Sequence, residues 1–327
     1  MNIRLRKIKS QEITTQNNQQ EEEEKPELSA EFPAVKIAFY LLFFTSFLTR
    51  VWRIQHPGQV VFDEVHFGKF ASYYLRPEFF FDVHPPLAKL MFALVGYLVG
   101  YEGSFLFEKI GMEYSEHHVP YVAYRLWSAF CGSLVVPLSF LILREIGVSA
   151  LGCIFGSLLL VFDNALITQS RMILLDSMLM VSCTFSIYCW IRFFKQRHKS
   201  FSFKWWKWLS LTGFSLAIVL SIKMVGLFTL ATIGVATLFD LWDILDVKRN
   251  PKFSTFAKHF GSRFLCLIVL PFVLYLIPYY LHFSILNVSG PGDTFMSIRF
   301  QSTLAGNNKT LGASGCSYIN FRCSFLF

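Results

Sequence analysis

Long apolar runs separated by short polar stretches dominate the sequence from residue 35 onward. Seven of these runs approach the roughly 20 residues that an α-helix needs to cross a bilayer. They cover residues 35–51, 121–143, 150–167, 172–194, 209–222, 225–242 and 264–282. The pattern predicts an all-α polytopic membrane protein with about seven transmembrane helices between residues 35 and 283.

The segments outside these runs divide into a tail and one long loop. Residues 1–34 are polar and low in complexity, so they cannot bury enough apolar surface to fold and are predicted to be disordered. Residues 55–120 separate the first two runs. Within that loop, apolar residues recur at helical spacing over 65–74 and 87–101, which predicts amphipathic helices lying at the membrane surface.

The distribution of basic residues predicts the orientation in the membrane. Lys and Arg concentrate in two inter-span segments, 195–207 and 248–263, which the positive-inside rule assigns to the cytosol. Alternating crossings then place the tail 1–34 in the cytosol and the loop 55–120 and the segment 284–327 on the lumenal side. Two N-glycosylation patterns, beginning at Asn287 and Asn308, fall on that same side.

Composition supports a membrane protein and argues against a nucleic-acid partner. Hydrophobic residues make up 54% of the chain and charged residues only 16%, which is outside the usual range of soluble domains. The net charge of +8 comes largely from clusters beside apolar runs, where it sets orientation. The seven Cys form no CxxC pair and no Cys/His cluster at metal-binding spacing, so no metal site is predicted.

The first extramembrane loop carries the residues most suited to chemistry. The adjacent carboxylates Asp63 and Glu64, and then Asp82 and His84, stand among Phe and Val residues. Burial in such surroundings shifts pKa values and makes these groups useful as acids or bases. His84 precedes two Pro residues, so a simple helix-starting turn is the alternative interpretation.

Basic candidates fall on the same predicted face as the acidic loop. Arg125 begins the second run, Arg171 precedes the fourth, and Lys223 lies at the turn between the fifth and sixth. They could hold an anionic leaving group, or they could be anchors at the ends of the spans. Asp176 lies within the fourth predicted span, where a carboxylate needs a partner. A structural or supporting role is favoured for it, and a pair with Arg171 is one option.

Six segments together resemble the protein O-mannosyltransferase family, whose members have the GT-C membrane fold and use dolichyl phosphate mannose. The segments are FDEVHFGKF (62–70), FFDVHPPLAKL (80–90), YRLWSAF (124–130), SRMILLD (170–176), SIKMVGLF (221–228) and NVSGPGD (287–293). Their wording is most similar to the second subfamily, whose members form heterodimers with a first-subfamily partner. In that family a lumenal MIR domain and further spans follow, so the resemblance implies that this chain stops before them at Phe327.

The resemblance implies an activity and roles for particular residues. The reaction would be inverting transfer of mannose to Ser or Thr hydroxyls of secretory proteins at the endoplasmic reticulum membrane, without a tightly bound cofactor. Asp63 would be the catalytic base, and Glu64 would help to position acceptor or donor. Arg125 and Lys223 would bind the donor phosphate, and Asp82 and His84 match a second acidic motif.

Two alternatives belong to other functional classes. A catalytically incomplete chain could act as a non-enzymatic partner of a full-length mannosyltransferase. A transporter would place ionisable groups at the membrane midplane and show a pseudo-repeat, whereas this sequence has no repeat and only Asp176 within a predicted span.

Overall fold

The computed structural model describes residues 25–245 and 253–307. Within these ranges the chain is helical, with a few isolated β-bridges and no longer strand. The helices are α2 (Lys25–Val51), α3 (Glu64–Leu75), α4 (Leu87–Leu98), α5 (Tyr121–Glu145), α6 (Ala150–Val161), α7 (Asn164–Ser170), α8 (Asp176–Phe194), α9 (Phe203–Ile222), α10 (Leu227–Ile244), α11 (Phe253–Phe264), α12 (Leu270–Ile285) and α13 (Ile298–Gln301).

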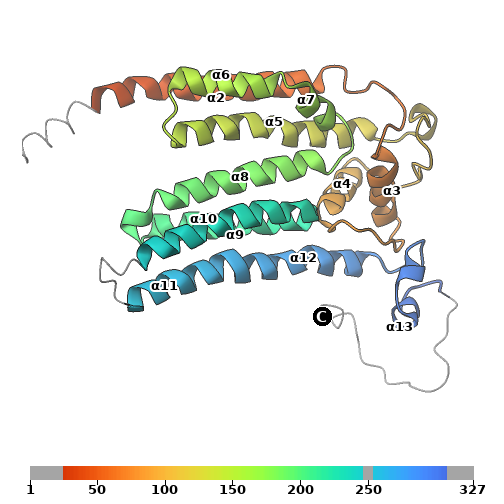
Figure 1. Ribbon diagram of the computed structural model, residues 1–327. Coiled ribbons are helices and arrows are strands. Elements are labelled where there is room, and N and C mark those ends of the chain that lie inside the picture. Colours follow the sequence, from red (N-terminus) through yellow and green to blue (C-terminus); the bar gives the residue numbers. More distant parts are fainter. Residues whose placement is uncertain (1–24, 246–252, 308–327) are drawn as a thin grey trace, which may run out of the picture.

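The long helices lie side by side in a bundle whose two ends differ (Figure 1). The short helices α3, α4 and α13 gather at one end, together with the start of α8 and the end of α9. The α8–α9 connection and the start of α11 lie at the other end. The segments predicted to be lumenal therefore share one end, and the described parts of the two basic segments lie at the opposite end.

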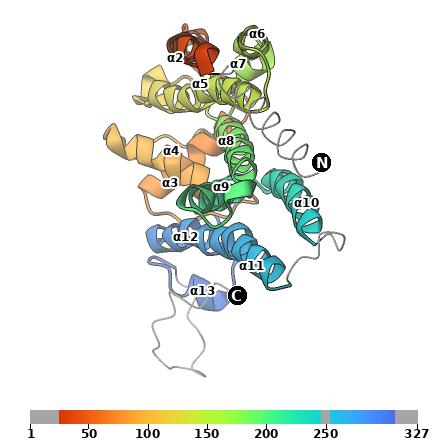
Figure 2. The same cartoon turned by 90° about the vertical axis from the view of Figure 1, so that its left-hand side faces the viewer.

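Successive helices form layers across the bundle. Viewed along the bundle from the end that carries the α8–α9 connection, α2 and α6 come first, followed by α5, then α8 and α9, and then α12 (Figure 2). Helix α4 packs against α3, α5, α9 and α12. The extramembrane loop is thus anchored on the central helices of the bundle, and this anchoring fixes the candidate residues in space.

The predicted all-α membrane fold is confirmed. Among the described residues, five helices are long and apolar enough to cross a membrane, or six if α6 and α7 together form one span. Helix α2 covers the first predicted run, but it begins at Lys25 and so includes part of the predicted disordered tail. The two predicted amphipathic segments of the loop are the helices α3 and α4.

The third predicted span is not one continuous helix. It breaks between α6 and α7, whose axes differ by 56°. Asp163 starts the new helix, because its carboxylate accepts a hydrogen bond from the Leu166 N–H at 2.7 Å. A helix-capping residue inside an apolar run therefore overrode the hydropathy pattern at this position.

The seventh predicted span is longer than expected and contains a π-helical segment. Helices α11 and α12 are joined without a break through Leu265–Val269. At this segment the Cys266 carbonyl approaches α9 so closely that a Cβ on Gly213 would lie 1.8 Å from its oxygen. The close packing of α9 against this span thus depends on the absence of a side chain at Gly213.

We expect Gly213→Ala to destabilise the bundle, by about 1–3 kcal/mol, because α9 must move away from the Cys266 carbonyl. A thermal unfolding measurement in detergent checks this. Gly234→Ala is the matched control, since Gly234 also lies inside a helix and no atom lies within 4 Å of its added Cβ. Equal midpoints for the two variants would contradict the close contact.

Candidate functional site

Glu64 and Arg125 form a buried, bidentate ion pair. Glu64 is 0% exposed and Arg125 is 1% exposed. Nε of Arg125 donates to Oε1 of Glu64 at 2.7 Å, and Nη2 donates to Oε2 at 2.8 Å. The carboxylate also accepts hydrogen bonds from the Tyr114 hydroxyl and from the N–H groups of Val61 and Ile173. This side chain has no unused oxygen for a substrate.

The remaining donors of Arg125 bind backbone carbonyls of the loop that enters the site. Its guanidinium donates to the carbonyl oxygens of Ile54, Pro57 and Gln59. Together with the two bonds to Glu64, these bonds engage all three guanidinium nitrogens of Arg125, so the geometry does not favour the predicted contact between Arg125 and the donor phosphate. The pair instead joins the loop, the start of α3, the start of α5 and the segment before α8.

Asp63, the neighbour of Glu64, is in a different environment. It lies at the start of α3 and is half-buried. Unlike most Asp residues at this position, it does not cap the helix, and within the described residues its carboxylate has no hydrogen-bond or ion-pair partner. The exposed Phe62 just before it adopts a φ of +49°, a strained conformation for a non-glycine residue. The acidic pair thus contains one structural carboxylate and one available carboxylate.

Asp82 and His84 lie in the segment between α3 and α4 and share a partner that the sequence analysis missed. Lys89, in the first turn of α4, donates to Oδ2 of Asp82 at 2.5 Å and to the His84 carbonyl at 2.7 Å. Lys89 is 1% exposed. A lysine at the start of an otherwise apolar helix was the available signal, since a buried ammonium needs a partner.

Lys223 and Asp176 form a second ion pair. Lys223 separates α9 from the turn that leads into α10, and its Nζ lies 3.1 Å from Oδ1 of Asp176. Asp176 is the first residue of α8 and of the span Asp176–Phe194, so it lies at the end of the predicted fourth span and not in its interior. Its position at a helix N-terminus is favourable for an anion. Both side chains remain partly exposed.

Arg171 does not pair with Asp176. Its guanidinium donates to the backbone carbonyls of Arg50, Trp52 and Arg53 at the end of α2. A cation at this position satisfies carbonyl groups that the helix leaves without partners. The structure therefore favours the anchoring alternative for Arg171.

His84 links the two ion pairs electrostatically. Burial lowers the pKa of His84, the nearby Asp82 and Asp176 carboxylates oppose that shift, and the Lys223 and Lys89 ammonium groups reinforce it. Because the pKa falls below its ordinary value, the imidazole is neutral at pH 7. We call the residues Asp82, His84, Lys89, Asp176 and Lys223 the charged cluster.

Two contacts place the N-terminal half of α3 beside segments of the charged cluster. Phe67, four residues after Asp63 and on the same face of α3, has its ring centroid 6.4 Å from that of His84. The Ile173 N–H donates to Glu64, so the segment leading to Asp176 lies beside the start of α3. Asp63, which immediately precedes α3, is therefore at the same end of the bundle as the cluster (Figure 1).

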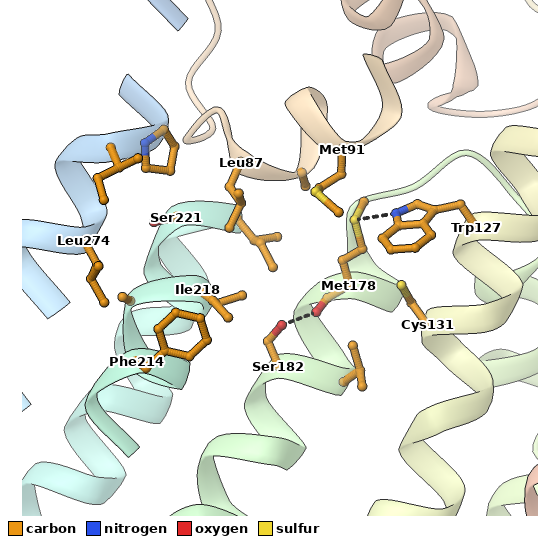
Figure 3. Close-up of a pocket in the computed structure, with 16 residues that line it drawn as sticks. Leu87, Met91, Trp127, Cys131, Met178, Ser182, Phe214, Ile218, Ser221 and Leu274 are labelled. Carbon is orange, nitrogen blue, oxygen red and sulfur yellow. Dashed lines mark hydrogen bonds between the residues drawn. The ribbon is translucent and has the colours of Figure 1, made fainter. Parts of the chain in front are cut away.

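An apolar cavity of about 420 Å³ opens among α4, α5, α8, α9 and α12. Side chains from these helices point into it, including Met91, Trp127, Met178 and Phe214 (Figure 3). Its lining includes residues next to the charged cluster in sequence, namely Leu87, Ser221 and Ile222. An apolar cavity that ends beside charged groups suits a ligand with an apolar tail and an anionic head.

Two further features to locate are the glycosylation patterns and any group of side chains able to bind a metal ion. Asn287 is exposed, and Asn308 lies outside the described residues. Ser289 of the first pattern donates its hydroxyl to Asp293 at 2.5 Å, so this pattern forms part of a hydrogen-bonded turn. Among the described residues, no group of three or more His, Cys, Asp or Glu side chains could hold a metal ion.

The sequence between residues 40 and 287 matches the family described as dolichyl-phosphate-mannose-protein mannosyltransferase. The chain belongs to this family. Dolichyl-phosphate-mannose–protein mannosyltransferase 4 of Schizosaccharomyces pombe is 50% identical over 283 residues, which are 86% of this chain and 36% of that protein. Protein O-mannosyl-transferase 2 of Danio rerio is 43% identical, over 86% of this chain and 37% of its own length.

A solved structure has the same arrangement of helices. The Saccharomyces cerevisiae protein O-mannosyltransferase Pmt1–Pmt2 complex bound to the sugar donor superposes with a TM-score of 0.80 at 36% identity, covering 85% of this chain and 37% of that one. This similarity supports the predicted GT-C fold. The chain spans a little more than a third of the length of each of these relatives.

The subfamily expectation needs correction. The sequence motifs favoured the second subfamily, but the relative designated 4 is 50% identical and the relative designated 2 is 43% identical. The six short motifs cover only a small part of the matched region 40–287, so they discriminate poorly between branches of the family. Identity over the whole matched region separates them better.

The buried ion pair predicts a large loss of stability when Arg125 is removed. Arg125→Ala leaves Glu64 charged and unpaired in the interior, which typically costs about 3–5 kcal/mol. The thermal midpoint in detergent and proteolysis of residues 52–63 would report the loss. Lys195→Ala is the control, because Lys195 also pairs with a carboxylate, Glu145, but at the surface, where the cost is below about 1 kcal/mol. Similar midpoints for both variants would argue against the structural role.

Proposed function

We propose that this chain forms the catalytic, membrane-embedded part of a protein O-mannosyltransferase. In this proposal it transfers mannose from dolichyl phosphate mannose to Ser or Thr hydroxyls of secretory proteins at the endoplasmic reticulum membrane. One observation carries the proposal: the apolar cavity ends beside the charged cluster, at the end of the bundle where Asp63 precedes α3 with its carboxylate unpaired among the described residues. A lipid-linked sugar phosphate needs an apolar site for its lipid tail and, next to it, a charged site for its phosphate.

The proposed reaction assigns separate tasks to Asp63 and Lys223. The Asp63 carboxylate takes the proton from the acceptor hydroxyl. At the same time, the hydroxyl oxygen of the acceptor bonds to the anomeric carbon of mannose. The bond from that carbon to the phosphate oxygen breaks, and its electron pair remains on the phosphate. Lys223 stabilises this charge. A single displacement inverts the anomeric configuration and needs no covalent intermediate on the protein.

The other candidate residues support this site without contacting the reacting atoms. Glu64 and Arg125 hold the start of α3, and so Asp63, in place. Asp176 orients Lys223 through their ion pair. Asp82 and His84 form the wall of the cluster beside the cavity.

We also propose that the chain pairs with a second protein mannosyltransferase. The solved relative with a TM-score of 0.80 is a complex of two mannosyltransferases, Pmt1 and Pmt2, which supports a partner of this kind. The narrower expectation of a first-subfamily partner rested on assignment to the second subfamily and is not part of this proposal.

Asp63→Asn should lower mannose transfer by about 100-fold or more, because the amide cannot accept the hydroxyl proton. Microsomes expressing each variant are supplied with labelled dolichyl phosphate mannose and a Ser/Thr-rich peptide. Glu116→Gln is the control, since Glu116 is an exposed carboxylate of the same loop. Transfer at the wild-type rate by Asp63→Asn would reject Asp63 as the base. A folded wild type that bound donor but transferred no mannose would favour a non-enzymatic partner.

Filling the apolar cavity should weaken use of the donor and leave use of the acceptor unchanged. Ile277→Trp places a larger side chain into the cavity from α12, and we expect the donor KM to rise about tenfold. Val273→Trp is the control, because Val273 lies one turn earlier, is 51% exposed compared with 49% for Ile277, and does not line the cavity. A donor KM raised equally by both variants would contradict this use of the cavity.

A further inference from the structure

The segment 77–86, which carries Asp82 and His84, is fixed by backbone contacts with the turn at 288–292. The Phe79 N–H donates to the Val288 carbonyl at 2.9 Å, and the Gly292 N–H donates to the Phe79 carbonyl at 3.0 Å. A Cβ on Gly292 would lie 2.5 Å from the carbonyl carbon of Phe80, so only glycine permits this approach. These contacts do not involve Lys89.

Lys89 binds the same segment from the opposite direction. Its ammonium contacts Asp82 and the His84 carbonyl, and it lies 5.2 Å and 5.6 Å from the ring centres of Phe70 and Phe80. Burial of an ammonium among aromatic rings is costly unless it is paired. Backbone contacts with the turn at 288–292 already hold the segment 77–86. Holding this segment in place therefore does not by itself explain why residue 89 is a charged lysine.

The charges of the cluster cancel only when Lys89 is counted. Asp82 and Asp176 contribute two negative charges, Lys89 and Lys223 contribute two positive charges, and His84 is neutral at pH 7. Without Lys89 the sum becomes −1. The phosphate of dolichyl phosphate mannose is a phosphodiester with one negative charge, so an unpaired Asp82 would repel it and compete with it for Lys223.

We propose that Lys89 is a positioning residue whose ammonium neutralises Asp82, so that the anionic donor phosphate can lie beside His84 and Lys223. This inference rests on the proposed function, because it assumes a phosphate-bearing donor. Lys89 acts through Asp82 and does not contact the reacting atoms. If Lys89 only filled space, an uncharged side chain of similar length at this position would leave anion binding unchanged.

The test measures binding of dolichyl phosphate mannose to purified protein in lipid nanodiscs, without an acceptor. We expect Lys89→Met to raise the Kd about tenfold or more, because the donor then meets an unpaired carboxylate. The double variant Lys89→Met/Asp82→Asn removes both charges and should recover most of the lost affinity. Lys109→Met removes an exposed lysine of the same loop and should change the Kd by less than about twofold.

Each outcome decides between the proposals. An unchanged Kd for Lys89→Met, or a double variant that binds as weakly as Lys89→Met, would overturn the role of Lys89. If Lys89→Met does not fold, the double variant decides, since it leaves no unpaired charge: a Kd more than about tenfold above wild type would overturn the inference. A wild-type protein that bound no donor would overturn the proposed function itself.

Discussion

The arrangement of the site depends on the buried pair between Glu64 and Arg125. Glu64 opens α3 and Arg125 belongs to the first turns of α5. Together they bind carbonyls and an N–H group of residues 54–61 and the N–H group of Ile173. Either charge buried without the other would carry a large desolvation cost, so the carboxylate and the guanidinium must stay in contact. This restriction fixes how the extramembrane loop sits on the bundle, and therefore where Asp63 and the charged cluster lie.

The same constraint separates two neighbouring carboxylates that look alike in the sequence. Residues 63 and 64 differ by about 100° around the helix axis, so one side chain can point into the interior while the other points toward the surface. Glu64 takes the interior position and is fully hydrogen-bonded. The ion pair of Glu64 therefore fixes the backbone of the neighbouring Asp63, whose own side chain takes no part in that pair. A carboxylate held in place but unpaired suits a general base.

Hydropathy predicted most of the fold because a membrane helix must satisfy its backbone internally over a fixed length. Hydropathy failed to predict the structure where one local interaction outweighed the mean hydropathy of an apolar run. Asp163 begins a new helix inside an apolar run, and Gly213 admits a carbonyl from a π-helical segment. Neither feature changes the mean hydropathy of its run. The motifs located the site. The ion pairs within it could not be predicted, because Arg171 and Arg125 look equally available in the sequence as partners for a carboxylate.

Lys89 shows why pairing matters more than the presence of charged residues. Four of the five members of the charged cluster stood out in the sequence as isolated charges or as a histidine, and all of these except Asp176 suggested a direct role with substrate. The fifth, hidden in an apolar helix, cancels one of them. An anion responds to the sum of nearby charges, so in our proposal the donor phosphate binds beside Lys223 because Lys89 neutralises Asp82. The affinity of this surface for an anion is thus a property of the paired set and not of any single cation.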